Sequence, residues 1–127
     1  MILTATSNKS VAELRDALPR AAATHKYGVL GILDLSAKMK EKGVVFEGEV
    51  LIFEVCNPQQ AKAVLEMSSE MSSFLPCRIS VYRASDGTTK LSTLRPTALV
   101  QGFGATSLGD VAAEVEAALT AIIDEAR

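Results

Sequence analysis

The stretch EVLIFEVCNPQQA at residues 49–61 decides how the fold of this chain is predicted. Its residues 50–53 are apolar at every position, whereas a strand with one face in water alternates apolar and polar side chains. We therefore expect residues 49–56 to form a central strand that is covered on both faces. Asn57 and Pro58 follow at once and suit the N-cap and the first turn of a helix. The stretch predicts a strand that leads directly into a helix.

The segment before this stretch carries a helix start signal. Ser10 and Glu13 have the spacing of a capping box, in which each side chain accepts a hydrogen bond from the other residue's backbone. Apolar residues continue at helical spacing as far as His25. Pro19 stands within this stripe and removes one backbone hydrogen bond, so we expect a kink or two shorter helices. Gly28 is the expected C-terminal stop.

Turn and capping residues bound the other segments. A Ser-Asp-Gly turn at residues 85–87 separates two alternating runs and predicts a hairpin. Ser36 suits the N-cap of a short helix, Ser107 suits the N-cap of the last helix, and a flexible, glycine-bearing connection is expected after Pro96. The expected strands are 2–6, 29–35, 77–83 and 89–95, and the expected helices lie before Gly43, from 58 to about 70, and at 108–126.

Strands interleaved with helices, together with one antiparallel hairpin, are typical of an α+β two-layer sandwich. We predict a mixed or antiparallel sheet with helices packed on one face. The chain has 127 residues, which is enough to bury a core without disulfides or metal. It shows no internal repeat and no linker, so we expect residues 1–127 to form a single domain.

The charge balance argues against a nucleic-acid-binding protein. Thirteen Lys and Arg residues stand against fifteen Asp and Glu residues, which gives a net charge of −2. Phosphate binding requires clustered basic side chains. The nearest cluster is Lys38, Lys40 and Lys42, which point in different directions in a short helix and have Glu41 among them. We therefore predict no nucleic-acid partner.

No apolar run approaches the roughly 20 residues that span a bilayer, so we expect no membrane partner. The N-terminal residues 1–10 lack the basic and apolar regions of a signal peptide, which favours a cytoplasmic location. In that compartment the two cysteines, Cys56 and Cys77, are expected to be reduced thiols rather than a disulfide.

The segments around these cysteines resemble a known family, the domain of unknown function 302. The resemblance runs from about residue 34 to residue 96. It is carried by Asp34-Leu35, Lys42-Gly43, Glu54-Val55-Cys56-Asn57-Pro58, Ala61, Leu65, Leu75-Pro76-Cys77-Arg78, Val81-Tyr82, Gly87 and Pro96. It implies a small bacterial or archaeal α+β domain that forms a homodimer. It transfers no catalytic residues, because none are agreed for the family.

The residues themselves predict a site around the cysteine pair. Cys56 ends a strand directly before a helix N-terminus, whose partial positive charge lowers the pKa of a thiol. Glu54 has the same strand parity and is a candidate proton acceptor beside it. Arg78 is able to bind an anionic group through two hydrogen bonds. The predicted site therefore consists of Glu54, Cys56, Asn57, Cys77 and Arg78.

Strand direction decides whether Cys56 and Cys77 meet. In parallel strands they lie at opposite ends, on the order of 20 Å apart, whereas in antiparallel strands they lie at the same end. The sequence leaves both arrangements open. It equally leaves open that both cysteines are small buried residues without a chemical role, which is a common use of free cysteine.

Other residues give weaker signals. His25 suits packing near a helix end, and a catalytic or haem-ligating role is the alternative. Met67, Met71 and Phe74 are expected to pack in the core, with a ligand pocket or dimer contact as the alternative. One histidine and two cysteines without a Cys-x-x-Cys motif are too few for a closed zinc site unless a dimer supplies them twice, so we predict no metal site. No cofactor is indicated.

From these residues we predict a homodimeric binding module, not an enzyme, for a small anionic ligand near Cys56, Asn57 and Pro58. The alternative is a thiol-based redox or sulfur-carrier protein that uses Cys56 with Cys77. A plain structural or interaction protein is the third hypothesis. A hydrolase is disfavoured, because one histidine does not build a Ser-His-Asp arrangement here.

Overall fold

Five strands form one antiparallel sheet in the order β1-β5-β4-β3-β2 in the computed structural model, which describes residues 1–127. The strands are β1 (Ile2–Ser7), β2 (Gly28–Asp34), β3 (Val50–Cys56), β4 (Cys77–Arg83) and β5 (Thr89–Leu94). The helices are α1 (Val11–Thr24), α2 (Leu35–Glu41), α3 (Pro58–Met67), α4 (Pro96–Gly102) and α5 (Gly109–Ala126), with 3-10 turns η1 (Ser69–Phe74) and η2 (Thr106–Leu108). The predicted α+β sandwich is confirmed.

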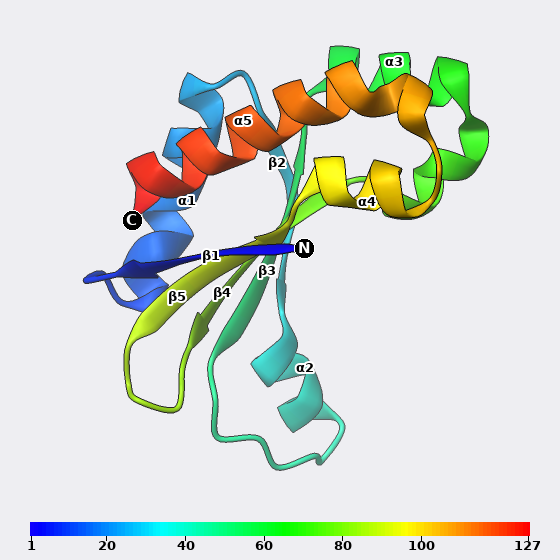
Figure 1. Ribbon diagram of the computed structural model, residues 1–127. Helices are drawn as coiled ribbons and strands as arrows, with labels where there is room; N and C mark the ends of the chain where they lie inside the picture. The colour runs from blue at the N-terminus through cyan, green and yellow to red at the C-terminus, as the bar shows by residue number, and fades with distance from the viewer.

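Helices α1 and α5 lie side by side over one face of the sheet, which we call the inner face (Figure 1). Alternate residues of the strands point to this face and pack against apolar residues of the two helices. The side chains of this core with at most 1% exposure are Leu14, Leu18, Ala22, Phe53, Val55, Ile79, Val81, Leu91, Leu119, Ile122, Ile123 and Ala126.

The opposite, outer face of the sheet has no fully buried side chain. Val50 and Ile52 point to this face and are only half-buried, so the prediction that β3 is covered on both faces was wrong. A row of hydroxyl groups crosses the outer face, since Ser92 hydrogen-bonds both Tyr82 at 3.1 Å and Thr4 at 3.0 Å. The apolar run of β3 therefore places Leu51 and Phe53 in the core and Val50 and Ile52 on a sheet face that no helix covers.

Helix α1 begins as predicted, with the capping box of Ser10 and Glu13 in place. Pro19 lies inside a continuous helix, so α1 is not divided into two shorter helices, and the kink that was the other expectation stays a prediction. Packing of α1 against α5 and the sheet offsets the single hydrogen bond that a proline removes. The helix stops before Gly28, because Lys26 takes the left-handed conformation at φ 63° and Gly28 already belongs to β2.

Two other predicted caps were wrong. Asp34 caps α2 by accepting a hydrogen bond from the Ala37 N–H at 2.9 Å, while Ser36 accepts one from the Val50 N–H at 2.8 Å. Ser107 lies inside η2, and α5 starts without a side-chain cap. Asp34 therefore takes the place predicted for Ser36, and the N-cap position of α5 is held by Leu108, which has no side-chain hydrogen bond to offer.

The segments on either side of the hairpin also differ from the prediction. Helix α3 ends at Met67, and the chain continues as the separate turn η1. The connection expected after Pro96 contains helix α4, in which Pro96 occupies the first turn. The hairpin of β4 and β5 is confirmed, with Gly87 at φ 85° in its turn.

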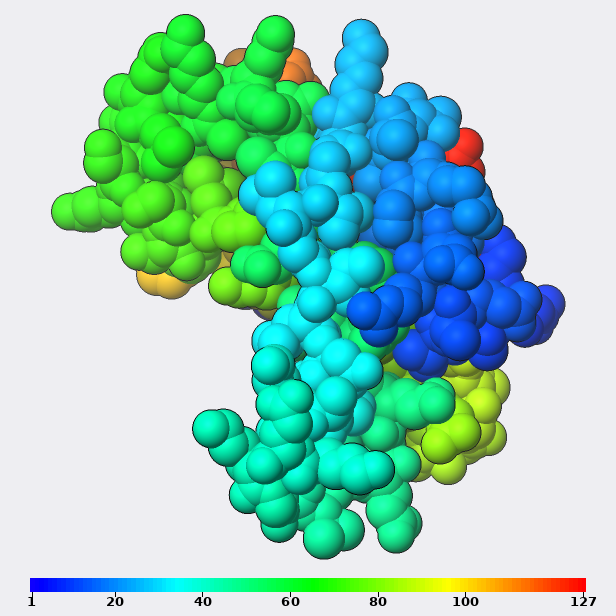
Figure 2. Space-filling model, turned by 180° about the vertical axis from the view of Figure 1, so that it is seen from behind, coloured from blue at the N-terminus to red at the C-terminus, as the bar shows by residue number.

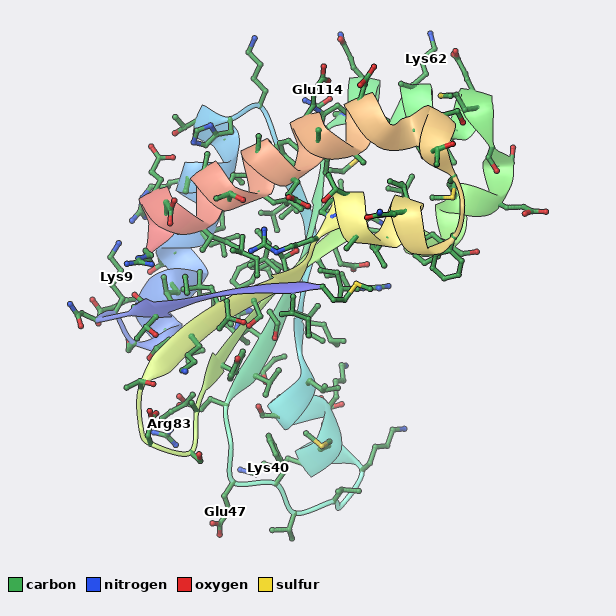
Figure 3. All side chains as sticks on the ribbon, viewed as in Figure 1. Lys9, Lys40, Glu47, Lys62, Arg83 and Glu114 are labelled. Atoms are coloured by element: carbon green, nitrogen blue, oxygen red, sulfur yellow. The ribbon has the colours of Figure 1, made fainter.

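Helix α2 and the connection after it stand out from the body of the molecule as an arm (Figure 2). Val44, Val45 and Phe46 in this connection are exposed, Val45 to 89%. Lys40 and Glu47 carry opposite charges on the same arm (Figure 3). The arm therefore combines an apolar tip with mixed charge.

Candidate functional site

The antiparallel pairing of β3 with β4 brings the two cysteines to the same end of the sheet. Cys77 is the register partner of Val55, one residue before Cys56. Successive strand residues point to opposite faces, so Cys77 faces the inner side and Cys56 the outer side. Both are free thiols. The two cysteines are therefore close neighbours in the sheet, and both line one small hollow at this end.

Cys77 is packed against the core and is a poor nucleophile. Burial and, to a lesser extent, the neighbouring Cys56 together raise the pKa of its thiol to about 11. At neutral pH this sulfur is protonated, whereas thiol exchange and sulfur transfer use the thiolate. The position therefore suits a small buried side chain better than a reactive one.

Asn57 holds the start of α3 in place. Its Oδ1 accepts a hydrogen bond from the Gln60 N–H at 3.0 Å, and its Nδ2 donates to the Lys26 carbonyl at 3.3 Å. The Tyr27 hydroxyl donates to Gln60 on the same turn. Burial raises the pKa of Tyr27, which keeps this phenol neutral. The predicted cap of Asn57 and Pro58 is confirmed, and the side chains at this helix end are occupied by structural bonds.

The hollow beside this helix end is small. Its volume is about 30 Å³, and its walls include Cys56, Asn57 and Cys77. On the same measure a single water molecule needs about 10–15 Å³, so the hollow has room for two or three waters at most. The hollow is therefore too small for an organic ligand.

Glu54 and Arg78 are register partners on the outer face. A Cβ atom at Gly31, which pairs with Glu54 on β2, would stand 3.2 Å from the Glu54 Oε1 atom, so the glycine makes room for the carboxylate. Arg78 is exposed and takes part in none of the four ion pairs of the structure. Its guanidinium remains free to bind an anion.

A larger cavity, of about 180 Å³, lies where the start of β4 and the end of β5 meet the helices. Thirteen of its 18 lining residues are hydrophobic. Cys77 and Arg78 from the predicted site lie in its wall, whereas Glu54, Cys56 and Asn57 do not. The lining residues are Val64, Met71, Ser73, Phe74, Leu75, Pro76, Cys77, Arg78, Thr93, Leu94, Pro96, Leu99, Val100, Leu108, Val111, Ala112, Val115 and Leu119.

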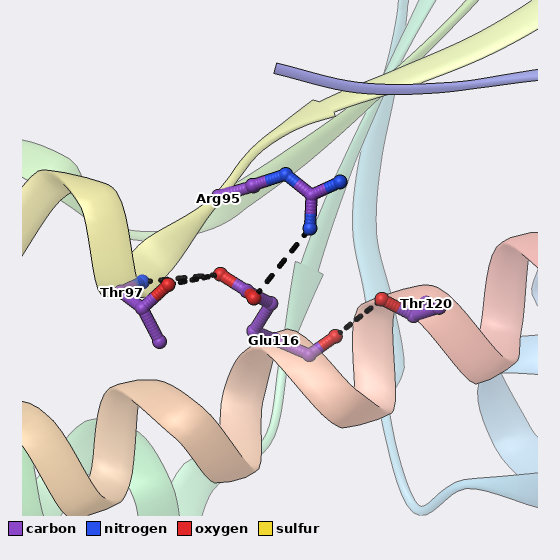
Figure 4. A network of polar contacts seen from close by, with 4 residues as sticks. All are labelled: Arg95, Thr97, Glu116 and Thr120. Atoms are coloured by element: carbon purple, nitrogen blue, oxygen red, sulfur yellow. Dashed lines mark hydrogen bonds and ion pairs between the residues drawn. The ribbon is translucent and has the colours of Figure 1, made fainter. Parts of the chain in front are cut away.

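Helix α4 forms one wall of this cavity and is tied to α5 by a polar network (Figure 4). The Glu116 Oε1 atom accepts hydrogen bonds from Thr97, from the backbone N–H at 3.2 Å and from the hydroxyl at 2.7 Å. The Glu116 Oε2 atom lies 3.6 Å from the Arg95 Nη1 atom. The carboxylate thereby acts as a cap on the first turn of α4, where no residue of α4 supplies one.

An aromatic pair joins the far end of α4 to η1. Phe103, which follows α4, packs on Phe74 with ring centroids 4.9 Å apart and planes tilted by 50°. Phe103 remains 66% exposed. The cavity thus lies between the network at the start of α4 and this pair at its end.

The cavity was not predicted, because a flexible, glycine-bearing connection was expected after Pro96, where the structure has helix α4. Pro96 as a first-turn residue and the apolar pair Leu99 and Val100 are the signal that indicates a short helix there. Met71 and Phe74 were predicted as core residues with a pocket as the alternative, and they line the cavity. Met67 of the same group is exposed to 53%.

His25 lies at the end of α1 and contacts α5. It is the C-cap residue, and its Nε2 atom lies 3.3 Å from the Glu125 Oε2 atom at the end of α5. No group of three or more His, Cys, Asp and Glu side chains gathers anywhere in the structure. None of the helices is long and apolar enough to cross a membrane.

The model of the family "Domain of unknown function DUF302" matches residues 3–126. The chain belongs to the DUF302 family. It is similar to a solved structure described as an uncharacterized conserved protein DUF302 from Bacillus stearothermophilus, with 34% sequence identity and a TM-score of 0.93. That match covers 99% of this chain and 98% of the other. A comparison with curated proteins gave no match.

The resemblance stated from Cys56, Cys77 and their neighbours is therefore confirmed, and it extends over almost the whole chain rather than residues 34–96. The family is one of unknown function, so membership supports the fold and leaves the activity to be inferred from the site.

Proposed function

We propose that this DUF302 protein is a non-enzymatic binding module for a small anionic molecule. The observation that carries the proposal is an apolar cavity of about 180 Å³ whose wall contains the unpaired Arg78. Ligand sites in proteins are hollows with apolar walls and a few polar groups that orient the ligand. The apolar part of the ligand fills the cavity, and Arg78 binds its charged group.

This proposal moves the ligand from the predicted position near Cys56, Asn57 and Pro58. The hollow at that position has a volume of about 30 Å³, and the Asn57 side chain is engaged with Gln60 and Lys26. The larger cavity keeps two of the predicted residues, Cys77 and Arg78, in its wall. The proposed ligand is still a small anion, and its site is now the larger cavity next to the predicted position.

The alternative of thiol chemistry with Cys56 and Cys77 has less support. Both cysteines are free thiols, and burial together with the neighbouring Cys56 raises the pKa of Cys77 to about 11, which disfavours its thiolate at neutral pH. Two free thiols fit a reducing compartment, so we retain the cytoplasm as the proposed location.

We also propose that the protein is a homodimer that pairs through the outer face of the sheet, with Arg78 and Leu94 at the edge of this interface, since they lie at the end of the sheet where β4 begins and β5 ends. Five strands about 4.8 Å apart, each some six residues long at about 3.4 Å per residue, cover roughly 500 Å² as a flat area. Projecting side chains and the apolar arm tip at Val44, Val45 and Phe46 add to this area. The area of the outer face together with these side chains approaches the roughly 800 Å² that each partner buries in a standard protein–protein interface.

Light scattering after size-exclusion chromatography tests the dimer. Ser80 lies at the middle of the outer face, opposite Ile52 and Ser92. We expect Ser80→Arg to yield a monomer and Ser72→Arg, at an exposed position of η1 away from the sheet, to leave the dimer intact. A monomeric mass for the unmodified protein would refute this interface.

Native mass spectrometry of freshly purified protein, with and without reductant, separates the two functions. Added mass that reductant leaves in place supports the binding module, and added mass that reductant removes supports thiol chemistry. Arg78→Ala is expected to lose the bound mass. Arg83→Ala is the matched control, since Arg83 is exposed at the opposite end of β4, by the hairpin turn (Figure 3). Equal loss in both variants would contradict the role of Arg78.

A further inference from the structure

We propose, on the basis of the proposed binding function, that the cavity selects carboxylic acids with a single six-membered ring or an equally compact hydrocarbon body. Size is the first argument. An apolar protein cavity of about 150 Å³ stays dry and accepts benzene. The present cavity, at about 180 Å³, has room for one ring and one or two further atoms.

The second argument is the apolar lining of the cavity, which disfavours ligands with a polar ring or chain. Val100, Leu108 and Leu119 belong to a nearly continuous apolar lining. Thr93 is one of its few polar residues, and its hydroxyl already donates to the Arg78 carbonyl at 2.7 Å. The structure contains no buried side-chain nitrogen or oxygen atom without a partner. A sugar or nucleoside would therefore bury hydroxyl groups that find no hydrogen-bond partner, which is unfavourable.

The charge is the third argument, and it indicates one carboxylate. Arg78 lies in the wall, and Leu94, an outer-face residue that is 47% exposed, lies beside it in the same lining, so the cavity reaches the surface there. The nearby Arg95 is paired with Glu116 and is not available. A single free guanidinium matches a group with one negative charge, whereas a di- or triphosphate requires several cationic partners.

The test is calorimetric titration with phenylacetate, its neutral analogue benzyl alcohol, acetate and decanoate. We expect phenylacetate to bind tightest, because acetate lacks the ring and decanoate is too long for the cavity. Arg78→Ala is expected to weaken phenylacetate roughly tenfold or more and to leave benzyl alcohol unchanged. Arg83→Ala is expected to leave both unchanged.

Two further variants, Ala112→Leu and Leu99→Ala, test the cavity, and a third, Ala113→Leu, is the control. Ala112→Leu fills it, whereas Ala113→Leu adds the same atoms to the exposed side of α5. We expect the first to abolish phenylacetate binding and the second to preserve it. Leu99→Ala enlarges the cavity and is expected to shift the preference toward longer acids, which provides a readout even if Ala112→Leu fails to fold.

The outcomes distinguish the ligand class from the binding function. Binding of acetate or decanoate as tight as that of phenylacetate, or equal effects of Ala112→Leu and Ala113→Leu, would overturn the proposed class. Failure of every acid, while native mass spectrometry still finds another bound molecule that Arg78→Ala removes, would overturn the class and leave the binding module in place. Absence of any bound molecule in both experiments would overturn the two together.

Discussion

Replacing Glu116 tests whether a residue of α5 holds α4 in position. Glu116 accepts two hydrogen bonds from Thr97 and lies 3.6 Å from Arg95, and its side chain is 22% exposed. Loss of a helix cap costs about 1 kcal/mol, and a hydrogen bond to a charged group contributes about 1.5–3 kcal/mol. The ion pair is partly exposed and contributes at most about 1 kcal/mol. We expect Glu116→Ala to lower the free energy of unfolding by about 2–3 kcal/mol.

The conservative substitution separates the cap from the charge. Glu116→Gln keeps an oxygen that accepts from Thr97 and loses only the attraction to Arg95, so a loss of at most about 1 kcal/mol is expected. Glu114→Ala on the same helix is the control, because Glu114 is exposed, forms no hydrogen bond or ion pair, and points away from the sheet (Figure 3). The chain has no tryptophan, so urea denaturation followed by circular dichroism is the assay.

Two results would refute the reasoning about Glu116. One is a loss below about 0.5 kcal/mol for Glu116→Ala, which would mean that water replaces the carboxylate at the start of α4 without cost. The other is an equal loss for Glu116→Gln and Glu116→Ala, which would assign the stabilisation to the ion pair with Arg95 rather than to the cap.

Three further predictions concern the core, a cap and the thiols. Phe53→Ala should lower the free energy of unfolding in urea denaturation by about 3–5 kcal/mol, because Phe53 is fully buried. A loss below about 2 kcal/mol would contradict its position in the core. Ser10→Ala should lower the free energy of unfolding by about 1 kcal/mol, and an unchanged free energy of unfolding would mean that the capping box does not stabilise the protein. Cys77 ionises near pH 11 when folded and near pH 9 when unfolded, so stability should fall as pH rises from about 9 to 11. Cys77→Ser should flatten that fall, and an unchanged slope would argue against burial of this thiol.

Much of the fold follows from local signals in the sequence. The capping box at Ser10, the cap at Asn57 with Pro58, and the hairpin turn before Gly87 each depend on interactions within a few residues. Such signals are present in the sequence itself. The strands and the two long helices were accordingly predicted within a few residues of their true bounds.

What the sequence did not reveal depends on contacts between distant residues. The cap of α4 comes from Glu116, 19 residues after Thr97, and no local pattern indicates it. The direction of β4 against β3, which brings Cys77 beside Val55, is likewise a property of the assembled sheet. Cys77 and Arg78 of the predicted site lie in the wall of the larger cavity, whereas the helices α4 and α5 that complete this cavity were not part of the prediction. The role of the predicted residues stays a prediction.

The pairing of β1 with β5 also bears on how the chain folds during synthesis. Ile2 pairs with Leu94, so the first strand has no partner in the sheet until most of the chain has left the ribosome. Strands β2, β3 and β4 form a meander of consecutive neighbours and are able to assemble earlier. Their inner face stays without α5 until residues 109–126 emerge. A ribosome stalled before that point would hold a partly formed sheet whose apolar inner face is covered by α1 alone, and transiently exposed apolar surface of this kind is what chaperones bind.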